Sequence, residues 1–128
     1  MDNSETYIKM CEKAVEIQGV QKEFPLPVGG YYTDGETLFC GCDIHSVGID
    51  YETEEFIWLP RQDQLQEMIK KGNETAHELN ARLYRFSSKN SSILTINYSM
   101  EQLWLAFVMK EKFNKTWNGE EWVDNGKE

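Results

Sequence analysis

Apolar residues near the N-terminus recur every three or four positions, which is the period of an amphipathic helix. The residues that share this stripe are Tyr7, Met10, Cys11, Ala14 and Ile17. Ser4 precedes the stripe and is a typical N-cap residue, whereas Gly19 follows it at a position that favours a helix C-terminus. The pattern therefore predicts one helix between Ser4 and Gly19.

The next apolar segments have the character of β-strands. Residues 24–30 hold two prolines and two glycines, which favours an ordered loop. Asp34-Gly35 then separates Tyr31-Tyr32 from the β-prone residues 37–40, and this arrangement predicts a hairpin. Residues 55–59 predict a further strand that is mostly buried.

The second half of the chain favours helices. Pro60 stands at or beside the first helical position, and Gly72 is expected to end that helix, whose apolar face holds Leu65, Met68 and Ile69. Asn73 is expected to cap a further helix with Ala76, Leu79, Leu83 and Phe86 on one side, although its end, residues 82–86, is also compatible with an extended segment. Residues 93–98 are β-prone.

The C-terminal segment carries two turn and capping signals. Ser99 and Gln102 form the S-x-x-Q pattern of a capping box before a helix that contains Leu103, Trp104, Phe107 and Val108. Asn118-Gly119 predicts a short hairpin in which Trp117 and Trp122 pair across the strands. We interpret this pair as packed over the helix, the alternative being an exposed aromatic platform for a partner. Trp58 and Trp104 are expected in the core.

These elements mix strands and helices without regular βαβ alternation. The prediction is an α+β fold in which a small, mostly antiparallel sheet is covered by three or four helices. The chain has 128 residues, which is the size of one ordinary domain, so we expect residues 1–128 to form a single domain.

Charge and cysteine content narrow the function classes. The formal net charge is −9, which disfavours direct binding to a nucleic-acid duplex because that surface is itself anionic. The sequence shows neither an apolar run long enough to span a bilayer nor a secretory signal pattern. Three cysteines are an odd number, so reduced thiols and a location in the cytoplasm are expected.

Metal binding and catalysis have few candidate residues. Cys40, Cys42 and His45 are good zinc ligands by type, but their spacing is not that of a standard zinc knuckle, and a fourth ligand could come only through the fold from Cys11 or His77. We expect a small core cysteine and a loop histidine there, with no metal and no cofactor. The sequence also lacks the G-x-S-x-G and H-E-x-x-H motifs, so we expect no enzyme activity.

Two other groups are candidate binding residues. Arg61, Gln62 and Gln64 are expected in the first turn of a helix, where free backbone N–H groups, the helix dipole and the arginine could bind an anion. The plainer interpretation is that Asp63 complements the dipole and that the glutamines are solvated. Glu52, Glu54 and Glu55 form an acidic cluster that we interpret as a solvated edge available to a basic partner.

Three segments resemble a family of small proteins encoded in phages and prophages of Firmicutes. They are MCEKAVEIQ at residues 10–18, IWLPRQDQLQEM at 57–68 and SMEQLWLAFVMKEKFNKTWNGEEWV at 99–123, in the same order along the chain. The resemblance implies life in the cytoplasm of a bacterial host and carries no established activity. It implies a non-enzymatic protein with a host or phage protein as its partner.

Small acidic phage proteins offer three hypotheses for this chain. The leading one is inhibition of a host antiviral defence system by imitation of nucleic-acid charge, as in some anti-CRISPR proteins. The second is sequestration of a small nucleotide signal in a pocket near the helix that starts at Arg61. The third is an accessory role in phage replication or morphogenesis. The oligomeric state stays open.

Overall fold

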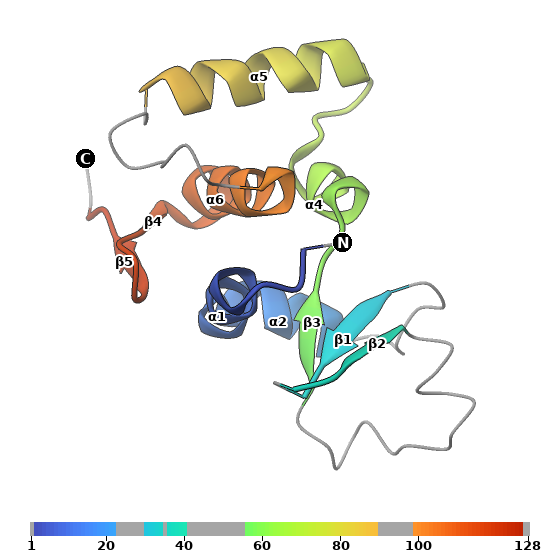
Figure 1. Cartoon of the computed structure of the whole chain (residues 1–128). Coiled ribbons are helices and arrows are strands. Elements are labelled where there is room, and N and C mark those ends of the chain that lie inside the picture. Colours follow the sequence, from blue (N-terminus) through green and yellow to red (C-terminus); the bar gives the residue numbers. More distant parts are fainter. Residues whose placement is uncertain (1, 23–29, 35, 41–55, 90–98, 127–128) are drawn as a thin grey trace. The chain divides into compact units, whose positions relative to one another are not determined.

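The computed structural model describes residues 2–22, 30–34, 36–40, 56–89 and 99–126. The chain divides into two compact units, Met1–Arg61 and Gln62–Glu128, and each is considered by itself. The α+β class is confirmed, since both units combine helices with antiparallel strands (Figure 1). In the described ranges the strands form a three-stranded sheet in the first unit and a two-stranded sheet in the second. The single-domain extent of residues 1–128 stays a prediction.

The predicted N-terminal helix is present, but it is interrupted at Ala14. Ser4 caps α1 (Glu5–Lys13), and its Oγ accepts a hydrogen bond from Tyr7 N at 3.2 Å. The Ala14 backbone leaves the helical region, and α2 (Val15–Lys22) then continues past Gly19. Our expectation that Gly19 ends the helix was therefore wrong. A glycine inside a helix costs only about 1 kcal/mol relative to alanine, which the packing of neighbouring residues can offset.

The first unit contains an antiparallel sheet in the order β2-β1-β3. Its strands are β1 (Tyr31–Thr33), β2 (Leu38–Cys40) and β3 (Ile57–Leu59), and in this register Tyr32 lies opposite Phe39 and Trp58. The hairpin predicted at Asp34 is confirmed. Asp34 Oδ1 accepts hydrogen bonds from Thr37 N at 2.8 Å and Glu36 N at 2.9 Å. These two donors hold the pKa of the Asp34 carboxyl below its usual value.

The core of the first unit lies between α1 and the sheet. All five residues of the predicted apolar stripe are buried, and α1 packs against β3, where Trp58 and Leu59 are also buried. Tyr7 is fully buried, and its hydroxyl donates a hydrogen bond to Pro60 O at 2.7 Å. This bond satisfies a polar group that burial would otherwise penalise, and it joins α1 to the residue that follows β3.

The second unit begins with two helices joined by a turn. Helix α4 (Gln62–Ile69) buries Leu65 and Ile69 as predicted and ends three residues before Gly72, which has a positive φ of 52°. Helix α5 (Ala76–Lys89) is helical through residues 82–86. Thr75 supplies its capping group, since Thr75 Oγ1 accepts a hydrogen bond from Glu78 N at 3.1 Å. The prediction of Asn73 as the cap was wrong because Thr75, with Glu78 three residues later, forms a capping box.

Helix α6 (Met100–Phe113) is the most buried element of the second unit. Ser99 Oγ accepts a hydrogen bond from Gln102 N at 3.1 Å, which confirms the predicted N-cap. The buried residues occupy almost every position of the middle turns: Gln102, Trp104, Leu105, Ala106, Phe107, Val108 and Met109. Within this unit α4, α5 and β4 (Lys115–Trp117) pack against α6. A helix buried on most sides is the centre of its core.

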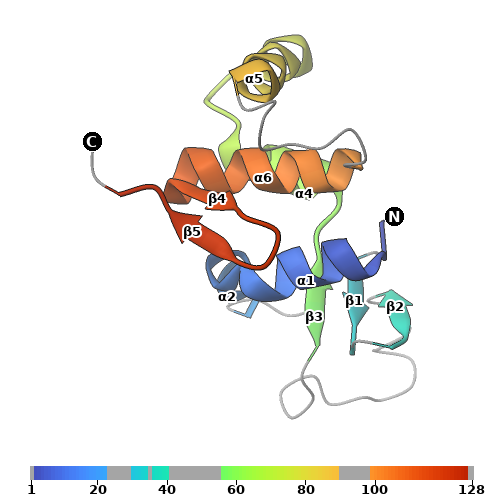
Figure 2. The same ribbon diagram turned by 60° about the vertical axis from the view of Figure 1, so that its left-hand side comes forward.

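The chain reverses after α6 into the predicted terminal hairpin, which runs back beside α6 (Figure 2). Asn114 adopts the left-handed conformation that ends α6. Strand β4 then pairs with β5 (Trp122–Asp124), and Trp117 lies opposite Trp122. Their ring centroids are 5.2 Å apart, and both side chains are buried, with 5% and 9% of their surface exposed. The predicted cross-strand pairing is confirmed, and the burial of both rings favours packing over an exposed platform.

We expect Trp117→Ala to lower the free energy of unfolding by about 3 kcal/mol or more, because a large buried ring is removed. Trp122→Ala should have an effect of the same order, whereas Val123→Ala, at the exposed position that follows Trp122, should change the free energy of unfolding little. Urea denaturation followed by circular dichroism measures all three. If both tryptophan variants unfold at the wild-type midpoint, the hairpin is not part of the core.

Candidate functional site

The residues of the predicted anion site are divided along the chain between the two units. Arg61 is the last residue of the first unit and precedes α4, while Gln62 and Gln64 lie in the first turn of α4 in the second unit. The placement of Arg61 inside the first turn was wrong by one residue, because the helix begins at Gln62. Gln62 and Gln64 are half-buried, and Asp63 is exposed where it complements the helix dipole.

Within the first unit, Arg61 is half-buried and acts electrostatically on Tyr32. Burial raises the pKa of the Tyr32 hydroxyl, and the positive charge of Arg61 opposes that shift only partly. Tyr32 is consequently a neutral phenol at physiological pH. An arginine near a neutral tyrosine can bind an anion or an aromatic ring, but this pair alone does not define a ligand.

The remaining predicted site residues lie mostly outside the described ranges. Those outside are Glu52, Glu54, Glu55, Cys42 and His45. Cys40 is in β2, so its backbone position is known. Within the ranges that the structure describes, His, Cys, Asp and Glu side chains do not gather into a group of three or more that could hold a metal ion.

The two other proposed metal ligands have separate environments. Cys11 is fully buried in α1, and burial raises the pKa of its thiol far above the usual value, so the thiol stays protonated. His77 is exposed on α5, in the second unit. A protonated, buried thiol is neither a good nucleophile nor a good metal ligand.

The side chain of Gln18 forms hydrogen bonds along the outer side of β3 in the first unit's sheet. Its Oε1 accepts a hydrogen bond from Trp58 N at 2.9 Å, and its Nε2 donates to Trp58 O at 2.8 Å and to Cys11 O at 3.1 Å. Among the described strands β3 lies at the edge of the sheet, where the backbone groups of Trp58 that face away from β1 need another partner. The Gln18 amide thus pairs with β3 at this position as a neighbouring strand would.

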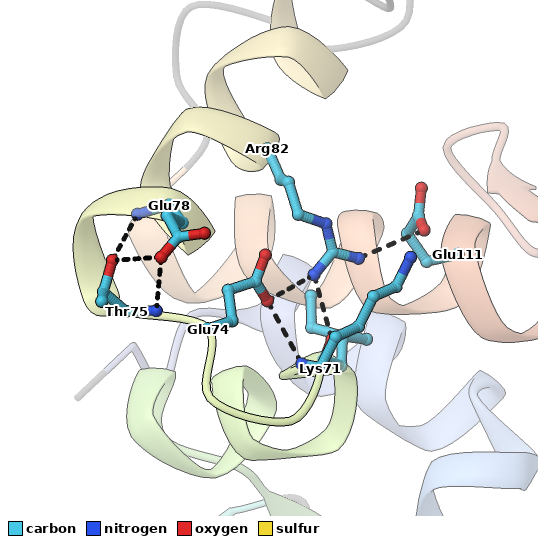
Figure 3. Close-up of polar contacts among 7 residues, drawn as sticks. Lys71, Glu74, Thr75, Glu78, Arg82 and Glu111 are labelled. Atoms are coloured by element: carbon cyan, nitrogen blue, oxygen red, sulfur yellow. Dashed lines mark hydrogen bonds and ion pairs between the residues drawn. The ribbon is translucent and has the colours of Figure 1, made fainter.

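Arg82 organises a second polar cluster, in the second unit (Figure 3). Its Nη1 donates to Glu74 Oε1 at 2.8 Å and to Ile69 O at 3.1 Å, and its Nη2 lies 3.4 Å from Glu111 Oε2. The guanidinium carbon is 5.6 Å from the centre of the Phe107 ring. The side chains of Arg82 and Glu74 are only 14% and 10% exposed, so this ion pair is largely shielded from solvent.

The Arg82 cluster explains how three helices and a turn are joined. The arginine binds the last carbonyl of α4, the turn residue Glu74 and the α6 residue Glu111 from its own position on α5. Glu74 Oε1 also accepts a hydrogen bond from Lys71 N at 3.2 Å. Every one of these contacts stabilises the packing of the unit, so we assign Arg82 a structural role.

The two units differ strongly in charge. Residues 1–61 contain 12 acidic and 4 basic residues, a net charge of −8, whereas residues 62–128 contain 10 acidic and 9 basic residues, a net charge of −1. Of the described carboxylates in the first unit, those with exposed side chains are Glu5, Glu12, Asp34 and Glu36. Almost all of the excess negative charge therefore belongs to the N-terminal unit.

Neither the contacts of Gln18 and Arg82 nor the difference in charge between the two units was predicted from the sequence. Gln18 and Arg82 bind groups that are up to 40 residues away along the chain, and local patterns do not reveal such contacts. A comparison of the net charge of the two halves of the sequence would have shown the asymmetry. The sequence patterns did not indicate that one unit ends at Arg61 and the next begins at Gln62.

Comparison with known proteins yields no relative: no family model matches the chain, and neither a curated protein nor a solved structure is significantly similar to it. The resemblance to a phage family therefore stays a prediction. Among the described residues, none of the helices combines the length and the apolar character needed to cross a membrane.

We expect Gln18→Glu to destabilise the protein by about 1–3 kcal/mol at neutral pH, because a carboxylate cannot donate to the Cys11 and Trp58 carbonyls. When the introduced carboxyl group is protonated it can donate to one of these carbonyls, so the loss of stability should become smaller as the pH falls. Glu12→Gln, which makes the reverse exchange at an exposed position of α1, is the control. Thermal melts across pH measure both variants. If the loss of stability does not change with pH, or is equally large in the control, the hydrogen bonds from Gln18 do not stabilise β3.

We expect Arg82→Met to lower the free energy of unfolding by about 3 kcal/mol, because it leaves Glu74 buried without its ion-pair partner. Arg82→Lys should lower the free energy of unfolding by a smaller amount, since lysine keeps the positive charge but lacks the planar guanidinium group with its several donors. Arg85→Met, at an exposed position on the same helix, should be close to wild type. Urea unfolding midpoints compare the three, and equal midpoints for Arg82→Met and Arg85→Met would exclude the structural role.

Proposed function

We propose that this protein is a non-enzymatic, phage-encoded binding protein whose acidic N-terminal unit engages a basic, nucleic-acid-binding surface of a host antiviral defence protein. The observation that carries this proposal is the charge asymmetry, with −8 in residues 1–61 and −1 in residues 62–128. A dense set of carboxylates on one small unit repels nucleic acid and attracts the cationic channels that bind it.

The exposed carboxylates of the first unit support this mode of binding. Glu5 and Glu12 are exposed on α1, and Asp34 and Glu36 are exposed in the loop between β1 and β2. The lowered pKa of Asp34 keeps that carboxylate ionised even in mildly acidic conditions. Glu52, Glu54 and Glu55 lie outside the described residues, and they add three negative charges to the sequence of the same unit.

Two features favour binding over catalysis. The Cys11 thiol is buried and protonated, so it cannot serve as an accessible nucleophile. The polar clusters around Gln18 and Arg82 also have a structural role, since both side chains satisfy backbone groups. An inhibitor that blocks a surface needs complementary charge and shape, but it needs no reacting group.

The test uses the full chain as bait in lysate of a bacterial host, followed by kinetics with the captured protein. The acidic variant carries Glu52→Gln, Glu54→Gln and Glu55→Gln. The matched control carries Glu67→Gln, Glu121→Gln and Asp124→Asn, which remove the same charge from exposed positions of the second unit. We expect the acidic variant to associate roughly tenfold more slowly and the control to remain near wild type.

Salt and competition complete the experiment. Wild-type binding should weaken steeply as salt rises, since exposed charges are screened over about 8 Å at physiological ionic strength. Duplex DNA should compete with the protein for the captured partner. Equal effects of the two triple variants would contradict the proposal. Weak salt dependence with binding abolished by Arg61→Ala would favour the nucleotide-pocket alternative, and a captured partner that DNA does not displace would favour an accessory role in phage replication or morphogenesis.

A further inference from the structure

The sequence contains two Asn-Gly dipeptides, Asn118-Gly119 and Asn125-Gly126, and both lie in exposed parts of the terminal hairpin region. In such a dipeptide the glycine backbone nitrogen can attack the asparagine side-chain carbonyl carbon, because glycine has no Cβ to hinder its approach. Exposure and dipeptide sequence are the same at both sites. Their hydrogen bonds differ, and these bonds decide how easily the reacting atoms meet.

At Asn125 both reacting partners are restrained. Asn125 Nδ2 donates to Asn114 O at 2.9 Å and to Thr116 Oγ1 at 2.9 Å, so the amide group is fixed in place. The nucleophile is restrained as well, since Gly126 N donates to Asp124 Oδ1 at 2.8 Å. Attack on the Asn125 carbonyl carbon would have to break several of these bonds.

At Asn118 the arrangement favours the attack. Asn118 Oδ1 accepts hydrogen bonds from Glu120 N and Glu121 N, both at 2.8 Å. Two backbone N–H groups at this distance stabilise negative charge on the oxygen, as they do in an oxyanion hole. Among the residues that the structure describes, neither Gly119 N nor Asn118 Nδ2 has a hydrogen-bond partner. Hydrogen bonds within the described residues therefore hold neither the attacking nitrogen of Gly119 nor the leaving nitrogen of Asn118.

We propose that Asn118 is a site of spontaneous deamidation in the folded protein and reacts faster than Asn125. Gly119 N attacks Asn118 Cγ and forms a new N–C bond, the negative charge on Oδ1 is held by the Glu120 and Glu121 amides, and the Cγ–Nδ2 bond breaks. Ammonia leaves with the proton that Gly119 N loses. Water then hydrolyses the cyclic imide, at Cγ to give aspartate or at the backbone carbonyl to give isoaspartate.

The two products have opposite effects on the hairpin. Aspartate keeps an oxygen acceptor for the Glu120 and Glu121 amides and adds a negative charge. Isoaspartate inserts a methylene into the main chain between Trp117 and Trp122, whose opposed register closes the hairpin. Reaction at Asn118 therefore produces one form that retains the tryptophan pair and one form that disrupts it.

The experiment follows the intact chain in mildly alkaline buffer, with peptide mapping by mass spectrometry. Cleavage after glutamate separates the two dipeptides, and an isoaspartyl methyltransferase assay identifies the isoaspartate product. We expect Asn118 to react roughly tenfold faster than Asn125, because the Asn125 reaction must break hydrogen bonds that the Asn118 reaction keeps. Equal rates, or a faster reaction at Asn125, would overturn the proposal.

Two controls distinguish the effect of the folded structure on the deamidation rates from the effect of the local sequence. In concentrated urea the hydrogen bonds are lost, so the two sites should react at similar rates, and a difference that persists there would overturn the structural explanation. Thr116→Val removes one partner of Asn125 and should accelerate the reaction at Asn125 while the rate at Asn118 is unchanged. An unchanged rate at Asn125 in a folded Thr116→Val variant would contradict the role of its restraints.

Discussion

Helix α6 is apolar around most of its circumference, so it is stable in water only when other elements cover it. This constraint accounts for the arrangement of the second unit. Helix α4 contributes the buried residues Leu65 and Ile69, and the hairpin contributes two buried tryptophans. Helix α5 contacts α6 through Phe86, whose ring centroid is 5.0 Å from that of Phe107. The left-handed Asn114 allows the chain to reverse immediately after α6. Each of these short elements is stabilised mainly by packing against α6.

Polar side chains complete both units in the same physical way. Secondary structure leaves backbone groups unpaired at helix ends and sheet edges, and a buried unpaired group costs about 1–3 kcal/mol. Gln18 pairs both backbone groups of Trp58 at the edge of β3, and Arg82 binds the Ile69 carbonyl at the end of α4. These side chains are long enough to reach across elements, which allows short strands and short helices to pack without orphaned polar groups.

Local signals in the sequence predicted most of the described elements, whereas interactions between distant residues could not be predicted. Ser4, Asp34, Ser99 and Asn118 act on neighbouring backbone groups, so the caps at Ser4 and Ser99 and the two hairpins were correctly placed, unlike the cap predicted at Asn73. The break at Ala14 and the continuation of α2 through Gly19 depend on tertiary packing, which overrides the weak local preference of glycine. The sequence was sufficient to select Arg61, Gln62 and Gln64 as candidate binding residues near the start of a helix. It did not predict that Arg61 belongs to one compact unit and the two glutamines to the next.

The functional account depends on the location of the excess charge, since −8 of the total −9 belongs to residues 1–61. An amide NMR titration of the full chain with a lysine-rich peptide at low salt tests this most directly, because the probe is a pure cation. The account predicts the largest shifts at exposed acidic positions of α1 and the β1–β2 loop, and their disappearance at high salt. Shifts concentrated on α5 or on the terminal hairpin would contradict it.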